Sequence, residues 1–208
     1  MRDAIARGLS RMGIDATDGQ REALEGFLHL LQKWNRVYNL TAITEPEAMV
    51  SRHLLDSLAV LPHLPPAGRF LDVGTGAGLP GIPLAIMMPD CDWVLLDSNG
   101  KKTRFVQQAI AELGLARAKV VRARVQDYHA EAFFDVVLSR AYASLADFVQ
   151  SVEHLRGPST RLMTLKTEPE AGDLRALREQ GHHIDIIRLR VPGIDAPRSL
   201  VLLERTDT

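Results

Sequence analysis

The residues best suited to chemistry lie in one short stretch, residues 70–81, where an apolar run ends in Asp72 and then gives way to alternating glycines. Glycine loses much conformational entropy on folding, so four glycines within residues 74–81 need a physical reason. A plain turn needs only one or two. The usual reason is close approach of a nucleotide-like ligand to the loop and to the first amides of the next helix. The stretch therefore predicts a strand, a tight turn and a helix that bind a cofactor.

Two cofactor classes fit this loop. The spacing Gly76-x-Gly78-x-x-Gly81 matches the dinucleotide fingerprint, a weak match by itself. The series Asp72-x-Gly74-x-Gly76-x-Gly78 resembles the first motif of class I S-adenosylmethionine (AdoMet) methyltransferases. An acid directly before the loop would repel a pyrophosphate, whereas AdoMet carries no phosphate and has an ammonium group that a carboxylate attracts. We therefore expect AdoMet at Asp72, Gly74, Gly76 and Gly78, with a nicotinamide dinucleotide as the alternative.

Further polar residues follow the later strands, at the sheet edge where ligands of such folds bind. Asp97 comes about twenty residues after the loop and suits the ribose hydroxyls, with capping of the next helix as its alternative role. Val125 and Gln126 follow the third strand, where an adenine ring would lie against backbone amides and a side-chain amide. Arg140 ends the fourth strand, where it contacts the cofactor or the acceptor, or makes a surface salt bridge.

The elements that position these residues alternate between strand and helix, which predicts an α/β, doubly wound, Rossmann-like sheet. Periodicity places parallel strands at 69–73, 92–96, 118–122, 134–138 and 161–165, with helices at about 80–88, 101–113, 145–154 and 173–180. A strand pair at 184–190 and 199–204 closes the sheet as an antiparallel addition.

Residues 1–66 form an expected N-terminal helical extension, and residues 67–208 the cofactor-binding domain, with the proline-rich linker 64–68 between them. Thr17 or Asp18 would cap the first long helix, and Pro46 lies in the first turn of a second helix that stops before Pro62. One apolar stripe is expected on the first helix, made by Leu24, Phe27, Leu28, Leu31, Trp34 and Val37.

Composition narrows the class of protein. A chain of 208 residues with 46% hydrophobic and 25% charged residues suits a soluble α/β domain with an extension. Cys91 is the only cysteine, which excludes an intramolecular disulfide and a thiolate metal cluster. The histidines and acids lack ligand spacing, so no metal is expected. No signal peptide or membrane span is evident, which favours a cytoplasmic protein.

The net charge of -1 excludes a uniformly basic nucleic-acid binder, but the charge is unevenly distributed. Residues 100–124 hold a single acid, Glu112, against seven bases: Lys101, Lys102, Arg104, Arg117, Lys119, Arg122 and Arg124. This run is either a solvated helix face or the contact for an anionic substrate.

Together these motifs resemble one family. The matching residues are Lys33-Trp34-Asn35, Tyr38-Asn39-Leu40-Thr41, Arg52-His53-Leu54-Leu55-Asp56-Ser57, residues 72–83, Leu96-Asp97-Ser98, Gly100-Lys101-Lys102 and Ser139-Arg140-Ala141. Across about residues 20–204 the chain resembles the bacterial 16S ribosomal RNA guanine-N7 methyltransferases, also called the glucose-inhibited division protein B family. The resemblance implies methyl transfer from AdoMet to N7 of a guanine in the 530 loop of 16S rRNA.

The resemblance also implies residue roles. Gly74 and Leu79 would contact AdoMet, Val125 and Gln126 would lie at its adenine, and Arg140 would be the catalytic residue near the donor. Gln126 stands where the family usually has an acid, and Thr167 where it commonly has glycine, so a side-chain role at Gln126 and the turn at Thr167 are in doubt. The expected RNA contacts are Lys101, Lys102, Arg122, Arg124, Lys166, Arg198 and His53.

The expected partner is 16S rRNA, within an assembling or assembled 30S subunit, and the protein is expected to be a monomer without membrane contact. Guanine N7 carries a lone pair, so no general base is required and catalysis depends on positioning. The alternatives are a class I methyltransferase that acts on another RNA, a protein or a small molecule, and a non-catalytic AdoMet-binding regulator.

Overall fold

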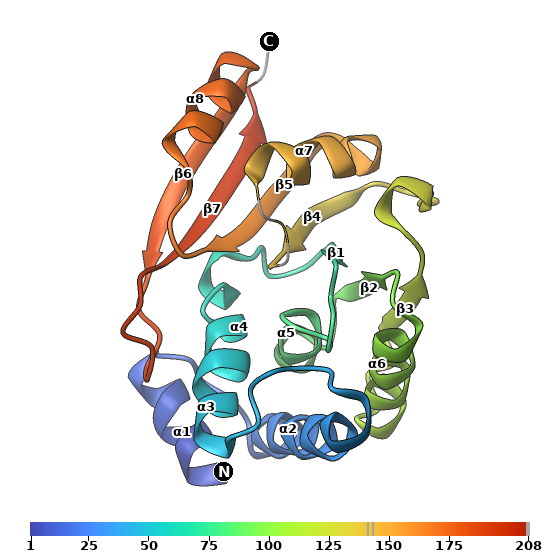
Figure 1. The fold of residues 1–208 in the computed structure, drawn as a ribbon, viewed down its shortest axis with the longest axis vertical. Coiled ribbons are helices and arrows are strands. Elements are labelled where there is room, and N and C mark those ends of the chain that lie inside the picture. The colour runs from blue at the N-terminus through green and yellow to red at the C-terminus, as the bar shows by residue number, and fades with distance from the viewer. Residues whose placement is uncertain (141, 143, 207–208) are drawn as a thin grey trace.

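The structure is a computed structural model that describes residues 1–140, 142 and 144–206. One sheet of seven strands has the order β3-β2-β1-β4-β5-β7-β6 (Figure 1). Strands β1 to β5 run parallel to one another, whereas β7 is antiparallel to both β5 and β6. The predicted doubly wound fold with a closing antiparallel pair is confirmed. The strands are β1 (Arg69–Val73), β2 (Asp92–Asp97), β3 (Ala118–Arg122), β4 (Phe134–Ser139), β5 (Arg156–Lys166), β6 (His182–Leu189) and β7 (Arg198–Arg205).

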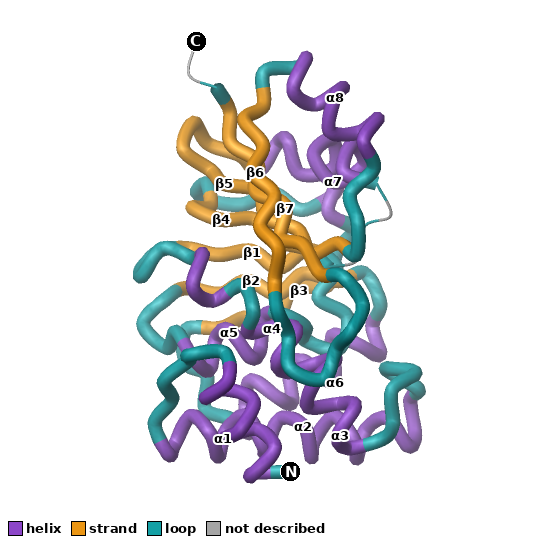
Figure 2. The backbone as a smooth tube through the Cα atoms, turned by 90° about the vertical axis from the view of Figure 1, so that its left-hand side faces the viewer, coloured by secondary structure: helices purple, strands orange, loops and turns teal. Residues whose placement is uncertain are grey.

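Helices cover both faces of this sheet (Figures 1 and 2). One face packs against α7 (Leu145–Val152) and α8 (Ala171–Glu179). The other face packs against α5 (Gly81–Met87), α6 (Gly100–Glu112) and the N-terminal helices. Those N-terminal elements are α1 (Arg2–Arg11), α2 (Asp18–Tyr38), α3 (Pro46–Met49), the π-helical segment η1 (Val50–Leu55), α4 (Asp56–Leu58) and the 3-10 turn η2 (Leu61–His63). Two further 3-10 turns are η3 (Val125–Asp127) and η4 (Glu153–Leu155).

The alternation of β1 sets which face each side chain serves. Phe70 packs on Trp93 of β2, with ring centroids 4.8 Å apart, in the core that includes the N-terminal helices. Leu71 and Val73 belong to the core beneath α7 and α8. Asp72 therefore points to the same side as Phe70, toward the start of α5.

The N-terminal helices largely follow their expected pattern. Thr17 caps α2 through a reciprocal capping box with Gln20. Leu24, Phe27, Leu28 and Leu31 are fully buried, but Val37 is 71% exposed. The prediction of Val37 as a core residue is wrong, because it lies in the last turn of α2, just before the left-handed Asn39 ends the helix.

Two further elements differ from the prediction. The helix expected from about residue 44 to 61 is interrupted by the π-helical segment η1. Strand β5 begins at Arg156 rather than near residue 161, because the register against β4 shifts between Phe134 and Val136. The Thr160 hydroxyl joins the two sides of this irregularity: it accepts from the Gly157 amide at 2.8 Å and donates to the Phe134 carbonyl at 2.6 Å.

Within the described part of the chain, no helix is both long and apolar enough to span a membrane. The same residues contain no group of three or more His, Cys, Asp or Glu side chains placed to hold a metal ion.

Replacing Gly81 by alanine is expected to destabilise the fold. A Cβ on Gly81 would lie 2.0 Å from Leu95 Cδ2 and 2.8 Å from Asp72 Oδ2, inside a fully packed region. Overpacking of this kind costs about 1–3 kcal/mol. Gly172→Ala in α8 is the matched control, because a Cβ there meets nothing within 4 Å and alanine favours a helix. Urea unfolding of both variants measures the difference, and equal stabilities would contradict the packing.

Candidate active site

The glycine loop after β1 is held by two carboxylates. Asp72 Oδ2 accepts hydrogen bonds from the Thr75 hydroxyl at 2.6 Å and from the Gly81 amide at 2.9 Å. Asp97 Oδ2 accepts from the Gly76 amide at 2.8 Å. The loop is therefore fixed between the ends of β1 and β2 and the start of α5.

The loop glycines serve different purposes. Gly74, Gly76 and Gly78 have φ angles of 69°, 58° and 76°, in the left-handed region that favours glycine. A Cβ on Gly76 would meet only Gly74 O and Lys102 Nζ, both at 3.9 Å, so no atom packs tightly against this backbone. A Cβ on Gly78 would lie 2.6 Å from Ile82 Cγ1, and Gly78 itself is buried. The missing side chain of Gly78 therefore makes room for α5, and its contact with the cofactor stays a prediction.

Asp72 carries a buried negative charge. The residue is 0% exposed, and its Oδ1 has no hydrogen-bond partner among the described residues. Burial, the largest influence, raises the pKa of this carboxyl to about 6, against the lowering effect of its two hydrogen bonds. A buried carboxylate that anchors the glycine loop, with one oxygen unpartnered, favours a cationic ligand at the loop and disfavours a phosphate. The residues present therefore fit AdoMet.

Asp97 does not cap the next helix. The cap of α6 is Asn99, whose side chain accepts from the amides of Lys101 and Lys102. Asp97 Oδ1 accepts a hydrogen bond from the Asn99 amide at 2.8 Å, so both carboxylate oxygens already accept from backbone amides. Any ribose contact by Asp97 must use the remaining lone pairs of this half-buried carboxylate.

The residues expected at the adenine lie in the turn after β3. Val125 is buried at the start of η3 and packs in the core beneath α7, whereas Gln126 is exposed. The Val125 backbone is thus fixed by its own side chain, and only the exposed Gln126 leaves a side chain available to a ligand. Leu79, by contrast, is 3% exposed in the opposite core, so it can contact a cofactor only through its backbone.

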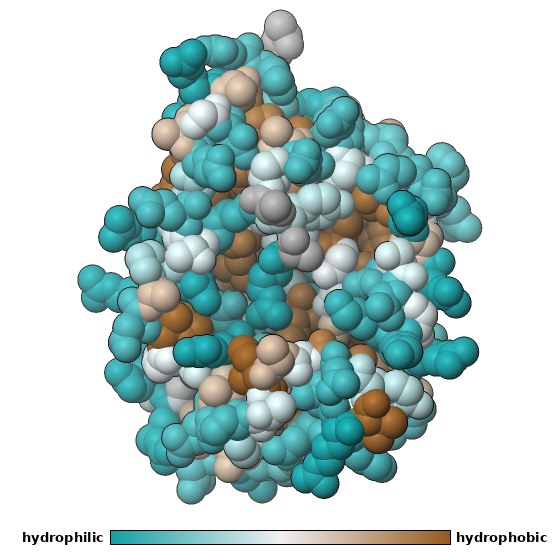
Figure 3. All heavy atoms as spheres, viewed as in Figure 1, coloured by the Kyte–Doolittle hydropathy of each residue, from teal (hydrophilic) through white to brown (hydrophobic). Residues whose placement is uncertain are grey.

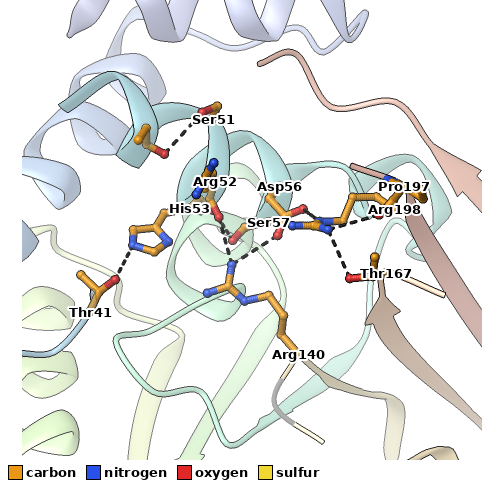
Figure 4. Close-up of polar contacts among 11 residues, drawn as sticks. Thr41, Ser51, Arg52, His53, Asp56, Ser57, Arg140, Thr167, Pro197 and Arg198 are labelled. Atoms are coloured by element: carbon orange, nitrogen blue, oxygen red, sulfur yellow. Dashed lines mark hydrogen bonds and ion pairs between the residues drawn. The ribbon is translucent and has the colours of Figure 1, made fainter. Parts of the chain in front are cut away.

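A pocket of about 610 Å³ lies beside the end of β4. Asp56, 4% exposed, is held between two arginines in this pocket (Figure 4). Arg198 Nε donates to its Oδ1 at 3.0 Å, and Arg140 Nη1 lies 3.4 Å from its Oδ2. Arg140 Nη1 also donates to the Arg52 carbonyl at 3.3 Å. The guanidinium of Arg140 is thus oriented by an acid from α4 and a carbonyl from η1.

The end of β4, beside this pocket, pairs with β1, after which the glycine loop begins. The Ser139 hydroxyl donates to the Val73 carbonyl at 2.7 Å, which ties the end of β4 to the end of β1. The charge of Arg140 also lowers the pKa of both Asp72 and His53, so one guanidinium acts electrostatically on both parts of the site. Figure 3 shows apolar surface within a hollow near the middle of the molecule, surrounded by hydrophilic side chains.

The sequence predicts His53 as an RNA contact, and the structure places it in the wall of the pocket with a buried side chain. His53 is 4% exposed, and its Nε2 lies 2.8 Å from the Thr41 hydroxyl. Burial lowers its pKa to about 4, and the charge of Arg140 acts in the same direction. His53 is therefore a neutral wall of the pocket rather than a cationic surface contact for phosphate.

The difference in stability between wild type and His53→Gln is expected to shrink in acid. The native pKa of about 4 lies below the unfolded value of 6.5, so the stability that neutral His53 contributes is complete above pH 6.5 and is lost as pH falls toward 4. Wild type should be the more stable protein at pH 7.5, and that advantage should shrink by about 2 kcal/mol at pH 5.0. Urea unfolding at both pH values measures it; an advantage that stays constant would show that His53 is not buried neutral.

The six cations expected at RNA fall into two groups. Lys101, Lys102, Arg122 and Arg124 lie near the ends of β2 and β3. Lys101, Arg122 and Arg124 are exposed, but Lys102 is half-buried with Nζ 3.9 Å from a Cβ built on Gly76, beside the cofactor loop. Lys166 and Arg198 line the acceptor-side pocket instead.

Burial lowers the pKa of Lys166, and its Nζ donates to the Tyr142 carbonyl. The Thr167 hydroxyl, where the resembling family commonly has glycine, accepts a hydrogen bond from Arg198 Nη1 at 3.4 Å. Ala141 of the Ser139-Arg140-Ala141 motif lies outside the described residues.

Sequence reasoning missed the residues that orient Arg140. Asp56 and Arg52 stand in the Arg52–Ser57 motif, but only His53 is predicted there as a site residue. Arg198 and Asp56 are 142 residues apart in the chain, and no local pattern joins them. The one available signal is the acid itself, Asp56, in a segment otherwise rich in leucine.

Comparison with known proteins agrees with this geometry. The model of the family described as rRNA small subunit methyltransferase G matches residues 20–201. The ribosomal RNA small subunit methyltransferase G of Stutzerimonas stutzeri is 46% identical over 205 residues, covering 98% of this chain and 95% of the relative. That of Yersinia enterocolitica is 48% identical over 197 residues, covering 94% and 95%.

Among solved structures, the Bacillus subtilis m1A22 tRNA methyltransferase TrmK superposes with a TM-score of 0.61. It is 12% identical, and the match covers 74% of this chain and 66% of the tRNA enzyme. At this identity the likeness concerns the fold alone.

Proposed function

The chain belongs to the rRNA small subunit methyltransferase G family, and we propose that it transfers a methyl group from AdoMet to N7 of a guanine in the 530 loop of 16S rRNA. Membership identifies the protein as a methyltransferase that uses AdoMet and excludes the nicotinamide alternative. The observation that carries the proposal is the pocket holding Asp56, Arg140 and Arg198 at the end of β4, which Ser139 joins to the end of β1 where the glycine loop begins.

The pocket suits a methyl acceptor whose attacking atom carries no proton that the enzyme must remove. His53 is held neutral with its Nε2 at Thr41, and Asp56 is engaged by two arginines. Neither is a free base, and guanine N7 needs none because its lone pair attacks directly. The chemistry that AdoMet supplies is an electrophilic methyl group. The protein must place N7 in line with it, and orientation of this kind contributes on the order of 7–11 kcal/mol at best.

We propose the following residue roles. Asp72, Gly74, Gly76 and the Leu79 backbone hold the methionine part of AdoMet, Asp97 its ribose, and Val125 with Gln126 its adenine. Arg140 lies between this site and the pocket, where its oriented guanidinium contacts the bound guanine as the catalytic residue. Lys102 is better placed beside the cofactor loop than on RNA.

The substrate must present an accessible guanine. The major groove of A-form RNA is deep and narrow and hides N7, so the target base is unpaired or flipped into the pocket. Lys101, Arg122 and Arg124 on one side, with Lys166 and Arg198 on the other, would neutralise flanking phosphates. We propose the 30S subunit, assembling or assembled, as the substrate, met in the cytoplasm by a monomeric enzyme.

The helical extension takes part in this site. Residues 1–66 supply Arg52, His53 and Asp56, while residues 67–208 supply the glycine loop, Arg140 and Arg198. We therefore propose that residues 1–66 and 67–208 are two parts divided at the linker 64–68, and that both parts form the acceptor pocket.

Methyl transfer from labelled AdoMet tests the proposal. Label should enter 16S rRNA of small subunits that lack the modification, with naked 16S rRNA and unmodified tRNA assayed alongside. Transfer only to tRNA, or to added protein, would contradict the small-subunit assignment while leaving the AdoMet site intact.

A further inference from the structure

Three pockets meet around the loop that joins β6 to β7. The acceptor-side pocket of about 610 Å³ adjoins a second of about 610 Å³ along residues 188–198 and a third of about 470 Å³ against α1 and η1. Gly193 lines all three. Arg198 lines the first two, Arg52 the first and third, and Arg11 the second and third. They therefore form one continuous depression from the acceptor pocket to the first helix.

The loop is firmly placed on the helical extension. Val191 is 6% exposed in the same core as Ile5 and Leu9 of α1, and Ile194 packs against that core. A Cβ on Gly193 would lie only 3.0 Å from Ser51 Cβ in η1. Figures 1 and 2 show the loop extending from the sheet down to the N-terminal helices. The depression thus has fixed walls.

Those walls are rich in unpaired positive charge. Arg7, Arg11, Arg52, Arg188 and Arg190 are exposed, and none makes an ion pair within the described residues. The acids that line the same pockets, besides the paired Asp56, are Glu47 and Asp195. The charge balance is therefore five free arginines against two carboxylates, on a protein whose net charge is -1.

We propose that this arginine surface (Arg7, Arg11, Arg52, Arg188 and Arg190) binds the sugar-phosphate backbone of rRNA that flanks the target base, on the side away from Lys101. The inference rests on the proposed function and extends its RNA contact from the acceptor pocket across the β6–β7 loop to α1. Sequence reasoning placed no RNA contact on any of these residues.

RNA fits this surface better than a protein does. The large hydrophobic side chains exposed on the described chain are Val37, Tyr38, Phe133 and Ile186. None of them lines the three pockets. A protein interface needs an apolar centre, whereas phosphate contacts need spaced cations and become weaker as salt rises.

The test compares three double variants with wild type. Arg7→Ala/Arg11→Ala removes two charges from α1, and Arg188→Ala/Arg190→Ala removes two from the end of β6 and its loop. Arg175→Ala/Arg178→Ala is the matched control, because it removes two exposed arginines from α8 at the opposite end of the molecule (Figure 1). Binding to naked 16S rRNA and to unmodified 30S subunits is measured between roughly 50 and 200 mM KCl, with methyl transfer to both.

Each test variant should bind rRNA roughly three- to tenfold more weakly at about 150 mM KCl, and its salt slope should fall by about 0.7 for each phosphate that is no longer neutralised. The α8 control should match wild type. Wild-type slopes in both test variants would overturn the proposal, as would weaker binding to 30S subunits without weaker binding to naked rRNA, which would indicate a ribosomal protein. If wild type itself transfers no methyl group to either substrate, the proposed function fails instead.

Discussion

Asp56→Asn should reduce kcat for methyl transfer by roughly 100-fold while the Kd for AdoMet changes by less than about threefold. Asp56 holds Arg140 at 3.4 Å and Arg198 at 3.0 Å. Asparagine keeps the size but removes the charge that orients both guanidinium groups. A displacement of about 1 Å in a positioning contact can cost about 100-fold in rate. We therefore regard Asp56 as a positioning residue that acts through Arg140.

The control for this prediction is Asp92→Asn. Asp92 pairs with Arg117 at 2.9 Å at the start of β2, the end away from Asp97 and the glycine loop. Asp92→Asn therefore also exchanges one arginine-paired carboxylate for an amide, but far from the site. A double-mutant cycle with Arg140→Ala separates positioning from folding, since residues that act through one another are not additive. If Asp56→Asn and Arg140→Ala multiply their effects on kcat, or if KM alone changes, Asp56 does not position Arg140.

Asp72→Asn should weaken AdoMet binding by at least about tenfold at pH 7.5 and abolish its dependence on pH between 5 and 7. Burial raises the pKa of Asp72 to about 6, so the carboxyl begins to take up a proton as pH falls toward 6. A cationic ligand binds the charged form preferentially. Wild-type affinity should therefore be constant above pH 7 and fall by up to about tenfold per pH unit below 6.

Asparagine is the informative substitution at this position. Its side-chain oxygen can still accept from Thr75 and Gly81, so the loop keeps the two contacts that Asp72 makes at 2.6 and 2.9 Å. The variant then isolates the charge from the geometry. Calorimetric titration with AdoMet from pH 5 to 8 provides the measurement. A pH profile shared by wild type and variant would place the titrating group elsewhere.

Much of the fold could be predicted from sequence because the central strands are continuous apolar runs between breaks. Parallel strands that are buried on both faces typically have such near-continuous apolar sequences. The glycine loop was equally plain, since its left-handed backbone leaves glycine little competition. The separate role of each glycine could not be predicted. Gly78 differs from Gly76 in its surroundings, because it packs against Ile82, and the spacing of glycines in the sequence does not show such packing.

The acceptor side was harder to predict because its residues meet only through tertiary structure. The π-helical segment η1 brings Arg52 and His53 to the pocket, and Asp56 follows it as the first residue of α4. A π-helical turn is wider than an α-helical one, so the sequence shows no α-helical period that would place these three side chains together. Arg198 reaches Asp56 from the last strand. His53 shows the same limit, since its residue type is plain in the sequence but its burial, and hence its neutral state, depends on the surrounding fold.

The most direct test of the central claim is to map the methylated atom. Small subunits lacking the modification are incubated with labelled AdoMet and either wild type or Arg140→Ala, and the labelled nucleotide of 16S rRNA is identified. Wild type should give one labelled N7-methylguanine in the 530 loop, and the variant at most a trace. Label at another atom or outside that loop, or equal labelling by the variant, would contradict the central claim.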